Sequence, residues 1–334
     1  MRVGKISLIK SEPRFIRLKR IMRKLGNFIH FVFIFFLFFS CSNKSKMSDV
    51  QIKKLDYPSA SAIEFYDGKL YLMGDDATDL FVLDTNLNIV DSIPIIPYPG
   101  NRIPKDIKPD LEASALYGDD LFLLGSGSLP TRNFGLKYNL KTKDIDSINL
   151  EPLYLKIKEL GIKQINIEGS CFISGKLILV NRGNKGRPEN HLIITDQKFW
   201  TNDSSFQISI IPFEAQKDTA LFKGISGLCY TKESDRLILT VSTEDTRNSY
   251  TDGTIGKSYL WIINSFSNKL GSAPLRPDKI IDLEEIDPRF KNQKIESATV
   301  IGETTNLIHL VLVADNDDGS STLFRFSLEK SSLK

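Results

Sequence analysis

The sequence predicts an all-β fold, a β-propeller with five blades of four antiparallel strands each. One pattern recurs five times along the chain: a short strand, a polar turn and a second, strongly apolar strand. A third strand and a weaker fourth strand follow most of these recurrences. One more strand precedes the first recurrence and can complete the last blade. Units of four strands repeated in series are typical of propellers.

Each recurrence begins at a lead residue, where the innermost strand of a blade starts. The lead residues are Ser61, Glu112, Glu168, Ser226 and Glu296, at spacings of 51, 56, 58 and 70 residues. The first two strands of the blades are predicted within 61–73, 112–124, 168–180, 226–241 and 296–313. Third strands are predicted at 80–83, 135–138, 192–194, 259–263 and 323–326, and fourth strands at 89–93, 145–148, 206–210 and 279–283.

The fifth unit lacks a fourth strand of its own. We expect residues 50–55 to supply it and to close the ring, because closure removes the exposed strand edges of an open array. The propeller domain is therefore predicted over residues 50–330, with a short helix at Glu151–Leu160. Six blades are the alternative, if the 70-residue unit or the 94–111 connection contains another blade. A β-sandwich is the competing all-β fold, but it does not explain five recurrences.

Composition and charge exclude several classes of protein. Of 334 residues, 41% are hydrophobic and 25% are charged, as in ordinary globular proteins. The formal net charge is +3, but residues 1–40 hold nine basic side chains and one acidic one. The remainder has 35 basic and 40 acidic residues, a formal charge of −5. An acidic domain disfavours nucleic-acid binding, which needs a basic surface to neutralise phosphates.

Residues 1–40 are predicted to be a targeting segment. Basic residues lead into an apolar run at 28–39, which is shorter than the roughly 20 residues that span a bilayer as a helix. The segment resembles a bacterial lipoprotein signal with lipidation at Cys41, although Phe38 stands where Leu is usual. Residues 41–49 would then be a short linker. We expect an exported, membrane-anchored lipoprotein that faces the periplasm or the cell surface. An uncleaved anchor and a plain soluble protein are the alternatives, and Met22 is an alternative start.

The two other cysteines, Cys171 and Cys229, occur at the same position of the repeat, three residues after the lead residue. An even number of cysteines in an exported protein allows a disulfide. The innermost strands of neighbouring blades splay apart, however, so a bond would require unusually close approach. We expect two small, buried, free thiols.

The connections between second and third strands are predicted to converge on one face of the disc, the face on which the innermost strands begin. They are long and polar, and occupy 74–79, 125–133, 181–190, 243–256 and 315–321. The opposite face receives only tight hairpin turns, such as those at 67–69, 118–120 and 174–176, which carry little functional signal. Candidate functional residues are therefore expected at the convergent face.

Three lead residues, Glu112, Glu168 and Glu296, are expected to ring the mouth of the central channel. Carboxylates held close together must share protons, pair with basic groups or bind a cation. One interpretation is a Ca²⁺ site formed by these three and Asp315, because Ca²⁺ prefers oxygen ligands. In the structural interpretation, each Glu accepts hydrogen bonds from the backbone of the adjacent blade.

Basic residues accompany these acids in the convergent loops. An arginine fork suits a carboxylate or phosphate group, and glycine-rich loops let backbone amides approach an anion. In the structural interpretation, arginine and glutamate from neighbouring blades neutralise one another. The predicted ligand-binding residues are Arg102, Lys108, Glu112, Arg132, Glu168, Arg182, Asn184, Glu244, Asp245 and Glu296. The sequence contains no nucleophile motif, Walker loop or zinc-ligand cluster.

Several of these motifs together resemble an uncharacterised family of bacterial propeller proteins with no assigned activity. The motifs are at 102–105, 108–113, 125–128 with Arg132, 166–169, 182–184, 244–246, 250–253 and 313–315. More distantly, the Glu-Gly lead at 168–169 and the strand ending in Asp315-Asn316 resemble phytase-like and esterase-like propellers. That second resemblance implies calcium and basic residues holding a phosphate ester, but the full calcium-cluster motif is missing.

The sequence thus predicts a propeller that binds a small polar or anionic ligand in an axial pocket without catalysis. A calcium-assisted phosphoesterase, a phosphoric ester hydrolase acting at the glutamate ring, is the alternative enzyme. A protein-interaction scaffold is the third interpretation. No cofactor is predicted with certainty beyond the candidate Ca²⁺ ion, and the membrane is the expected partner through the N-terminal lipid. The protein is expected to be a monomer.

Overall fold

The computed structural model describes residues 47–334 except 201–204, 218–221 and 245–254. The predicted targeting segment, Cys41 and Asp245 lie outside the described residues, so lipid attachment at Cys41 stays a prediction. Within the described part of the chain, no helix is both long and apolar enough to cross a membrane.

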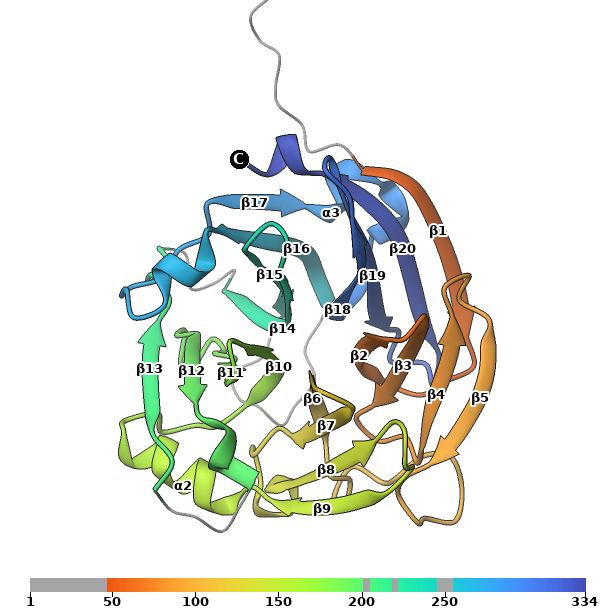
Figure 1. The fold of residues 1–334 in the computed structure, drawn as a ribbon, viewed down its shortest axis with the longest axis vertical. Coiled ribbons are helices and arrows are strands. Elements are labelled where there is room, and N and C mark those ends of the chain that lie inside the picture. The colour runs from red at the N-terminus through yellow and green to blue at the C-terminus, as the bar shows by residue number, and fades with distance from the viewer. Residues whose placement is uncertain (1–46, 201–204, 218–221, 245–254) are drawn as a thin grey trace, which may run out of the picture. The chain divides into compact units, whose positions relative to one another are not determined.

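Five four-stranded antiparallel sheets are arranged around a central axis as a five-bladed β-propeller (Figure 1). Blade 1 contains β2 (Ala60–Tyr66), β3 (Lys69–Gly74), β4 (Asp79–Asp84) and β5 (Ile89–Pro94). Blade 2 contains β6 (Leu111–Tyr117), β7 (Asp120–Gly125), β8 (Phe134–Asn139) and β9 (Ile145–Asn149). Blade 3 contains β10 (Ile167–Ile173), β11 (Lys176–Asn181), β12 (His191–Thr195) and β13 (Ile208–Pro212). Blade 4 contains β14 (Lys223–Thr231), β15 (Arg236–Glu244), β16 (Ile255–Asn264) and β17 (Lys279–Asp282). The predicted five blades are confirmed.

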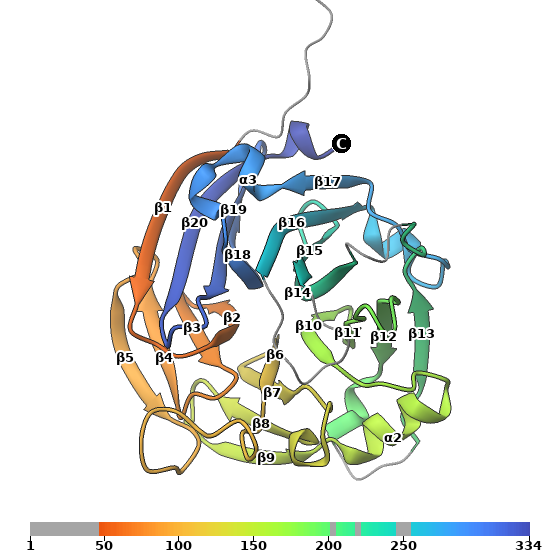
Figure 2. The same ribbon diagram turned by 180° about the vertical axis from the view of Figure 1, so that it is seen from behind.

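Blade 5 joins the two ends of the domain. It contains β18 (Lys294–Glu303), β19 (Leu307–Asp315) and β20 (Ser321–Glu329), and its outermost strand is β1 (Met47–Leu55). Strand β1 runs antiparallel to β20, with Gln51 opposite Arg325 and Leu55 opposite Ser321. The predicted closing strand at 50–55 is thus confirmed, and it begins three residues earlier than expected. Figures 1 and 2 show β2, β6, β10, β14 and β18 innermost from both sides.

The hairpins between first and second strands follow from their turn residues. Asp67 and Gly68 have φ angles of 46° and 75°, and Ser174 and Gly175 have 50° and 77°. Two consecutive left-handed residues form the two-residue turn that matches the twist of the flanking strands. The second strand of each blade is apolar because both its faces are covered by neighbouring sheets.

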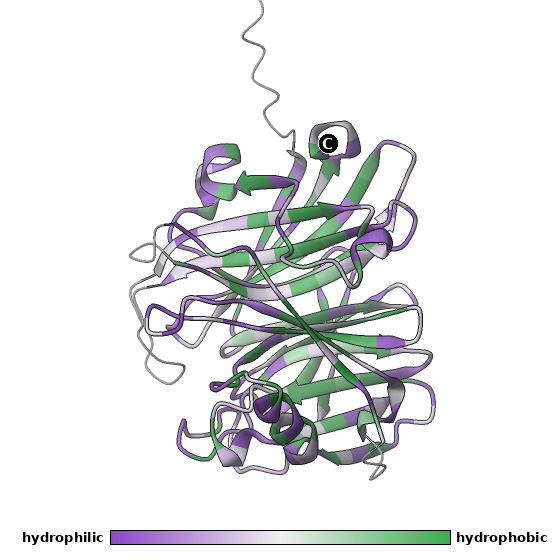
Figure 3. Cartoon of the chain, turned by 90° about the vertical axis from the view of Figure 1, so that its left-hand side faces the viewer, coloured by the Kyte–Doolittle hydropathy of each residue, from purple (hydrophilic) through white to green (hydrophobic). Residues whose placement is uncertain are grey.

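The hydrophobic core lies between neighbouring blades. Leu72 of blade 1, for example, shares a buried cluster with Leu121 and Leu123 of blade 2. Figure 3 shows apolar segments along the strands and hydrophilic residues in the loops. Burial of this kind provides most of the free energy that holds the blades together. Polar groups of the loops are therefore left to shape the two faces of the disc.

The remaining elements are short. The predicted helix is confirmed as α2 (Glu151–Glu159), which buries Leu153, Tyr154 and Ile157 against the core. The other α-helix of the described residues is α3 (Leu283–Ile286). It begins at the last residue of the strand predicted at 279–283, so β17 ends one residue earlier than predicted. Five 3₁₀ segments, η1 (Pro130–Arg132), η2 (Gln197–Trp200), η3 (Phe266–Lys269), η4 (Pro288–Phe290) and η5 (Lys330–Leu333), complete the set. The connection at 94–111 contains no further blade among the described strands.

Two smaller expectations also have an outcome. Cys171 and Cys229 are free thiols, as predicted, but only Cys229 is fully buried and Cys171 is half-buried. The fourth strand of blade 3 begins at Ile208, two residues later than predicted.

Candidate functional site

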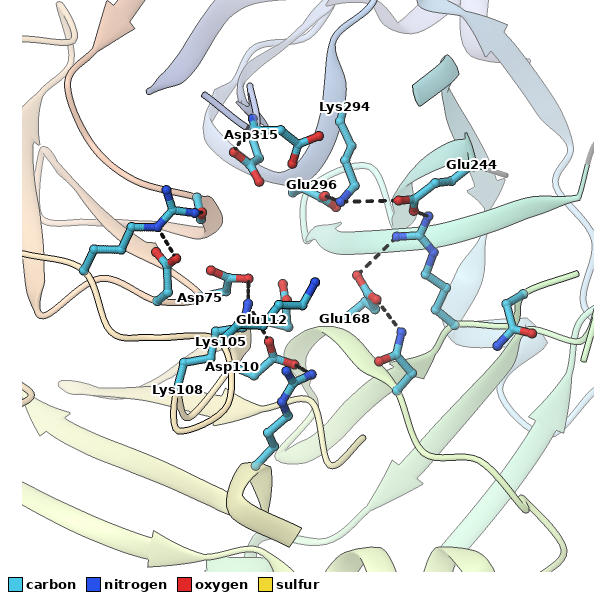
Figure 4. Close-up of a pocket in the computed structure, with 18 of the residues that line it drawn as sticks. Asp75, Lys105, Lys108, Asp110, Glu112, Glu168, Glu244, Lys294, Glu296 and Asp315 are labelled. Atoms are coloured by element: carbon cyan, nitrogen blue, oxygen red, sulfur yellow. Dashed lines mark hydrogen bonds and ion pairs between the residues drawn. The ribbon is translucent and has the colours of Figure 1, made fainter. Parts of the chain in front are cut away.

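A charged pocket lies at the axis, on the face where the innermost strands begin (Figure 4). Its cavity volume is about 150 Å³. All five of the long loops supply lining residues, as does the 94–111 connection. The polar and charged lining residues are Ser59, Asp75, Asp76, Arg102, Lys105, Lys108, Asp110, Glu112, Arg132, Asn166, Glu168, Arg182, Asn184, Glu244, Lys294, Glu296, Asp315 and Asp317.

Every lead residue occupies a β-bulge near the start of its innermost strand. The pairing register between the first and second strands shifts at Ser61, Glu112, Glu168, Ser226 and Glu296. A bulge adds one unpaired residue to a strand and redirects its side chain. The repeat that was visible in the sequence is therefore a repeated bulge, and three of the five bulges carry glutamates that line the axial pocket.

The serine and glutamate lead residues make different contacts. The hydroxyl of Ser61 donates to the backbone oxygen of Leu111 at 2.6 Å, and that of Ser226 donates to Ile295 at 2.6 Å, so each serine ties its blade to the next one. Among the described residues, no backbone N–H donates to the side chains of the three lead glutamates. The partners seen for Glu168 and Glu296 are side chains.

One ion-pair network joins blades 1 and 2. The ammonium group of Lys108 lies between Asp75 and Asp110, at 2.9 Å from Asp110 Oδ1. Arg132 holds the other oxygen of Asp110 at 2.7 Å. Burial opposes the charge on Lys108, but Asp75 and Asp110 more than offset it and raise the pKa of Lys108. The ammonium group of Lys108 is therefore the cation that neutralises Asp75 and Asp110.

A second network joins blades 3, 4 and 5. The guanidinium of Arg182 contacts Glu168 Oε2 at 3.4 Å and Glu244 Oε2 at 3.0 Å. Lys294 Nζ lies 2.9 Å from Glu296 Oε1 and 3.8 Å from Glu244 Oε1. Among the described residues, three acids thus share two basic groups. All five side chains are largely buried, so loss of any one partner would be costly.

Gly224 makes room for Arg182. A Cβ atom built on Gly224 would lie 2.4 Å from Arg182 Nε and 3.0 Å from its Cγ. The arginine side chain therefore crosses directly over the backbone of β14 to reach Glu244. A larger residue at 224 would push the guanidinium away from both carboxylates.

Carboxylates outnumber basic groups in the pocket. Among the described lining residues there are nine acids and six bases, a formal excess of three negative charges. Burial raises the pKa of Asp75 to about 6 and the pKa values of Glu168 and Asp315 to about 7. Burial, followed by the nearby charge of Asp110, also raises the pKa of Glu112 well above its usual value. Near neutral pH several of these carboxyls are therefore partly protonated.

Two lining acids, Glu112 and Asp317, have carboxylates that make no hydrogen bond or ion pair within the described part of the chain. In addition, no donor among the described residues reaches Asp76 Oδ1 or Glu296 Oε2, although both atoms are buried. Buried acceptors of this kind ordinarily have a partner, either protein, water or ligand. The unpartnered oxygens line the same pocket.

One group of acids could hold a metal ion. Asp75, Asp110 and Glu112 offer oxygens that lie within 4.8 Å of one another. Of the four predicted calcium ligands, Glu112 belongs to this group, and Glu168, Glu296 and Asp315 do not. Carboxylate oxygens suit Ca²⁺, but the ammonium of Lys108 already bridges Asp75 and Asp110. A metal ion would have to displace it.

The structure brings the described residues of the predicted site together. Arg102, Lys108, Glu112, Arg132, Glu168, Arg182, Asn184, Glu244, Glu296 and Asp315 all line the pocket, and their binding roles stay predictions. Arg102 pairs with Asp76 at 2.5 Å. The side-chain oxygen of Asn184 accepts hydrogen bonds from Gly186 and Arg187, so it also shapes its own loop.

Sequence reasoning missed several lining residues that share one position. Ser59, Asp110, Asn166 and Lys294 each stand two residues before a lead residue, and Gly224 occupies that position in blade 4. Aligning the five repeats two positions further back would have found them. Asp75 and Asp76 lie in a predicted convergent loop, but nothing in the sequence distinguished them from other loop acids.

Solved structures with related folds are distant in sequence. Glutaminyl cyclase from Myxococcus xanthus is 12% identical over 86% of this chain and 98% of its own, with a TM-score of 0.43. A member of the DUF4221 family from Bacteroides vulgatus is 11% identical over 86% and 99%, with a TM-score of 0.37. Virginiamycin B lyase from Staphylococcus aureus is 10% identical over 83% and 99%, with a TM-score of 0.38.

The family comparison agrees with the boundaries of the propeller. No curated protein matches the chain. A family of unknown function, DUF6929, matches residues 56–328, which run from the end of β1 to the end of β20. The match covers four complete blades, blade 5 without its outermost strand β1, and every described residue of the axial pocket. The chain therefore belongs to the DUF6929 family of propeller proteins, whose function is unknown.

Proposed function

We propose that the axial pocket binds a small organic cation, a molecule with an ammonium or guanidinium group, and that the protein acts as a binding protein. The observation that carries this proposal is the formal excess of three negative charges in the described lining. Glu112, which has no partner among the described residues, is the central acceptor.

The basic residues of the pocket argue against an anionic ligand. Lys108, Arg182 and Lys294 each contact two carboxylates. An incoming phosphate or carboxylate would have to break these pairs and leave buried acids without a counter-ion, which costs several kcal/mol. A cation instead adds partners to acceptors that lack them. We therefore propose a cationic ligand in place of the anionic ligand that the sequence suggested.

The size of the cavity limits the ligand. A volume of about 150 Å³ accommodates a molecule of a few heavy atoms. Glu112, Glu296 and Asp315 supply acceptor oxygens from blades 2 and 5, and the ligand would bridge the two networks.

Titration of the full-length protein with ethanolamine, putrescine and agmatine, followed by calorimetry, tests the proposal. We expect at least one of these amines to bind, and Glu112→Gln to weaken its binding at least about tenfold, because the substitution removes a charge partner from a buried site. Glu329→Gln is the matched control, since it removes the same charge outside the pocket. Binding of none of the amines, or equal binding by Glu112→Gln, would contradict the proposal.

Affinity for the cation should rise between about pH 5 and pH 8. The cation binds the ionised carboxylates, and the raised pKa values of Asp75, Glu168 and Asp315 keep these groups partly protonated below neutrality. Binding near pH 6 should therefore release protons, as measured by calorimetry in buffers with different ionisation enthalpies. Affinity that is constant across this range would show that these carboxyls do not take part.

The acid group Asp75, Asp110 and Glu112 favours a second candidate, a calcium-assisted phosphoesterase. In that function the three carboxylates would hold Ca²⁺, and Lys108, once displaced, would face the phosphate group. Hydrolysis of p-nitrophenyl phosphate by the full chain, lost on chelation and restored by CaCl₂, would support this candidate. Together with the absence of amine binding, it would replace the binding protein as the explanation of the pocket.

A further inference from the structure

A second cavity lies at the other face of the disc, where the sequence showed only tight hairpin turns. Its volume is about 650 Å³, which is in the range of pockets that hold drug-sized molecules. Its lining includes Glu64, Tyr117, Cys171, Phe172, Tyr230 and Lys232. None of these residues lines the axial pocket.

The cavity follows from one position of the repeat. Glu64, Cys171, Cys229 and Thr299 each stand three residues after a lead residue, on four different innermost strands. Ala115 occupies this position in blade 2. The side chains at this level are therefore of modest size except for Glu64, and the inner end of the cavity stays open.

Small residues separate the two pockets. One residue after each lead residue stand Ala62, Ala113, Gly169, Gly227 and Ser297. A Cβ atom on Gly169 would lie 2.8 Å from Gly227 Cα, and one on Gly227 would lie 2.4 Å from the backbone oxygen of Glu296. The innermost strands thus touch at this level and narrow the channel between the axial pocket and the second cavity.

Glu64 is the only acid among the lining residues of the second cavity. The hydroxyl of Ser114 donates to Glu64 Oε1 at 3.1 Å, and no basic group among the described residues forms an ion pair with it. Burial raises the pKa of Glu64 to about 8. A carboxyl held by one hydroxyl in apolar surroundings retains acceptor capacity for a ligand.

Apolar and aromatic side chains form part of the cavity wall, and polar groups, among them Lys232 and Thr299, form the rest. Tyr117 and Phe172 pack with their ring centroids 4.9 Å apart, and Trp200 packs behind Phe172 at 6.2 Å. Tyr230 of β14 also lines the cavity. Aromatic faces attract an organic ammonium group and also cover its hydrocarbon part. Apolar walls around one carboxyl are thus complementary to an amphiphilic amine.

We propose that this second cavity binds an apolar or aromatic amine, whose ammonium group pairs with Glu64 and whose hydrocarbon part contacts Tyr117, Phe172 and Tyr230. The site is independent of the axial pocket, because the two share no lining residue. It differs from that pocket in ligand class, since it has one carboxyl and many apolar contacts. The axial pocket has many carboxyls and almost no apolar wall.

The test compares three probes of similar shape: 2-phenylethylamine, 2-phenylethanol and 3-phenylpropanoate. Calorimetry with the full-length protein at about pH 9, where Glu64 is ionised and the amine is still protonated, is expected to show binding of the amine at least about tenfold tighter than that of the neutral alcohol, with no binding of the acid. Glu64→Gln should remove the preference for the amine, and Glu329→Gln should retain it. Equal affinity for amine and alcohol in the unaltered protein would overturn the proposal, as would an unchanged preference in Glu64→Gln.

A second readout needs no substitution. Cys171 is half-buried at the cavity wall, whereas Cys229 is buried. Modification by N-ethylmaleimide under mildly alkaline conditions, followed by peptide mass spectrometry, is expected to label Cys171 first. Bound 2-phenylethylamine should slow labelling of Cys171, and ethanolamine, a probe of the axial pocket, should not. Equal labelling with and without 2-phenylethylamine at saturating concentration would count against binding in this cavity.

Discussion

Replacing Arg182 by methionine should lower the free energy of unfolding by about 3–5 kcal/mol near pH 8. Arg182 is 8% exposed and bonds Glu168, Glu244 and Ser242. Its loss removes the guanidinium shared by two buried carboxylates, and methionine fills similar space without charge. Near pH 6 the loss should be smaller, because the pKa of Glu168 is already raised to about 7 and protonation removes the charge that needs a partner. Urea denaturation at both pH values measures the difference.

An exposed ion pair provides the control for this substitution. Lys54 Nζ lies 3.1 Å from Asp318 Oδ2, and the two side chains are 63% and 55% exposed. Lys54→Met removes the same formal charge, and its effect should stay below about 1 kcal/mol. If Arg182→Met cost no more than Lys54→Met, the buried network would not stabilise the fold as described.

Replacing Gly227 by alanine should destabilise the propeller by about 1–3 kcal/mol. The new Cβ atom would lie 2.4 Å from Glu296 O, 2.7 Å from Thr240 Oγ1 and 3.1 Å from Ser297 Cα. Two of these are backbone atoms of β18, so strands β14 and β18 must move apart. The movement also displaces the bulge that carries the Glu296 carboxyl. Thermal and urea unfolding measure the loss of stability, and weaker cation binding should accompany it.

Gly302 offers a matched control on the neighbouring innermost strand. It also lies at a register shift, but a Cβ atom there would meet nothing closer than His309 Cδ2 at 3.8 Å. Gly302→Ala should leave stability nearly unchanged. A Gly227→Ala protein as stable as Gly302→Ala would show that the blades tolerate a wider gap at the axis.

Much of the fold could be predicted because each blade repeats the same local pattern. The lead residues and the apolar second strands occur five times, and glycine-containing hairpin turns join the first two strands of three blades, so errors in one unit are corrected by the others. The ends of elements were less predictable. Leu283 is apolar enough to continue a strand, but Asp282 caps the backbone amides of Glu284 and Glu285 and starts a helical turn there.

The chemistry of the axial pocket was harder to predict. The sequence shows that Arg182 and Glu244 lie in loops of one face, but not that one guanidinium spans Glu168 and Glu244. Without these pairings, arginine-bearing and glycine-rich loops suggested an anion site. Lys294, which pairs with Glu296 only two residues away, looked like an ordinary strand residue. The residue that it pairs with, Glu296, is itself the bulged residue, and bulges have no strong sequence signal.

The second cavity was missed for another reason. The short hairpin turns leave this face without long polar loops, so the sequence offered no candidate binding residues there. The cavity is lined mainly by side chains of the strands, and its size depends on the spacing between neighbouring blades. Glu64 occurs in an apolar strand, where a single acid could equally point to solvent. Only the packing of neighbouring blades shows that it does not.

Because β1 pairs with β20, the ring can close only after the whole domain has been synthesised. Strand β1 leaves the ribosome before any blade is made, whereas its partner at 321–329 is made after all the others. Until then β1 is an unpaired strand with a free edge, and the contact that completes the domain spans about 270 residues of chain. Long-range closure of this kind slows folding. Separation of β1 from β20 would also open the ring, so resistance to proteolysis should depend on how tightly β1 is held.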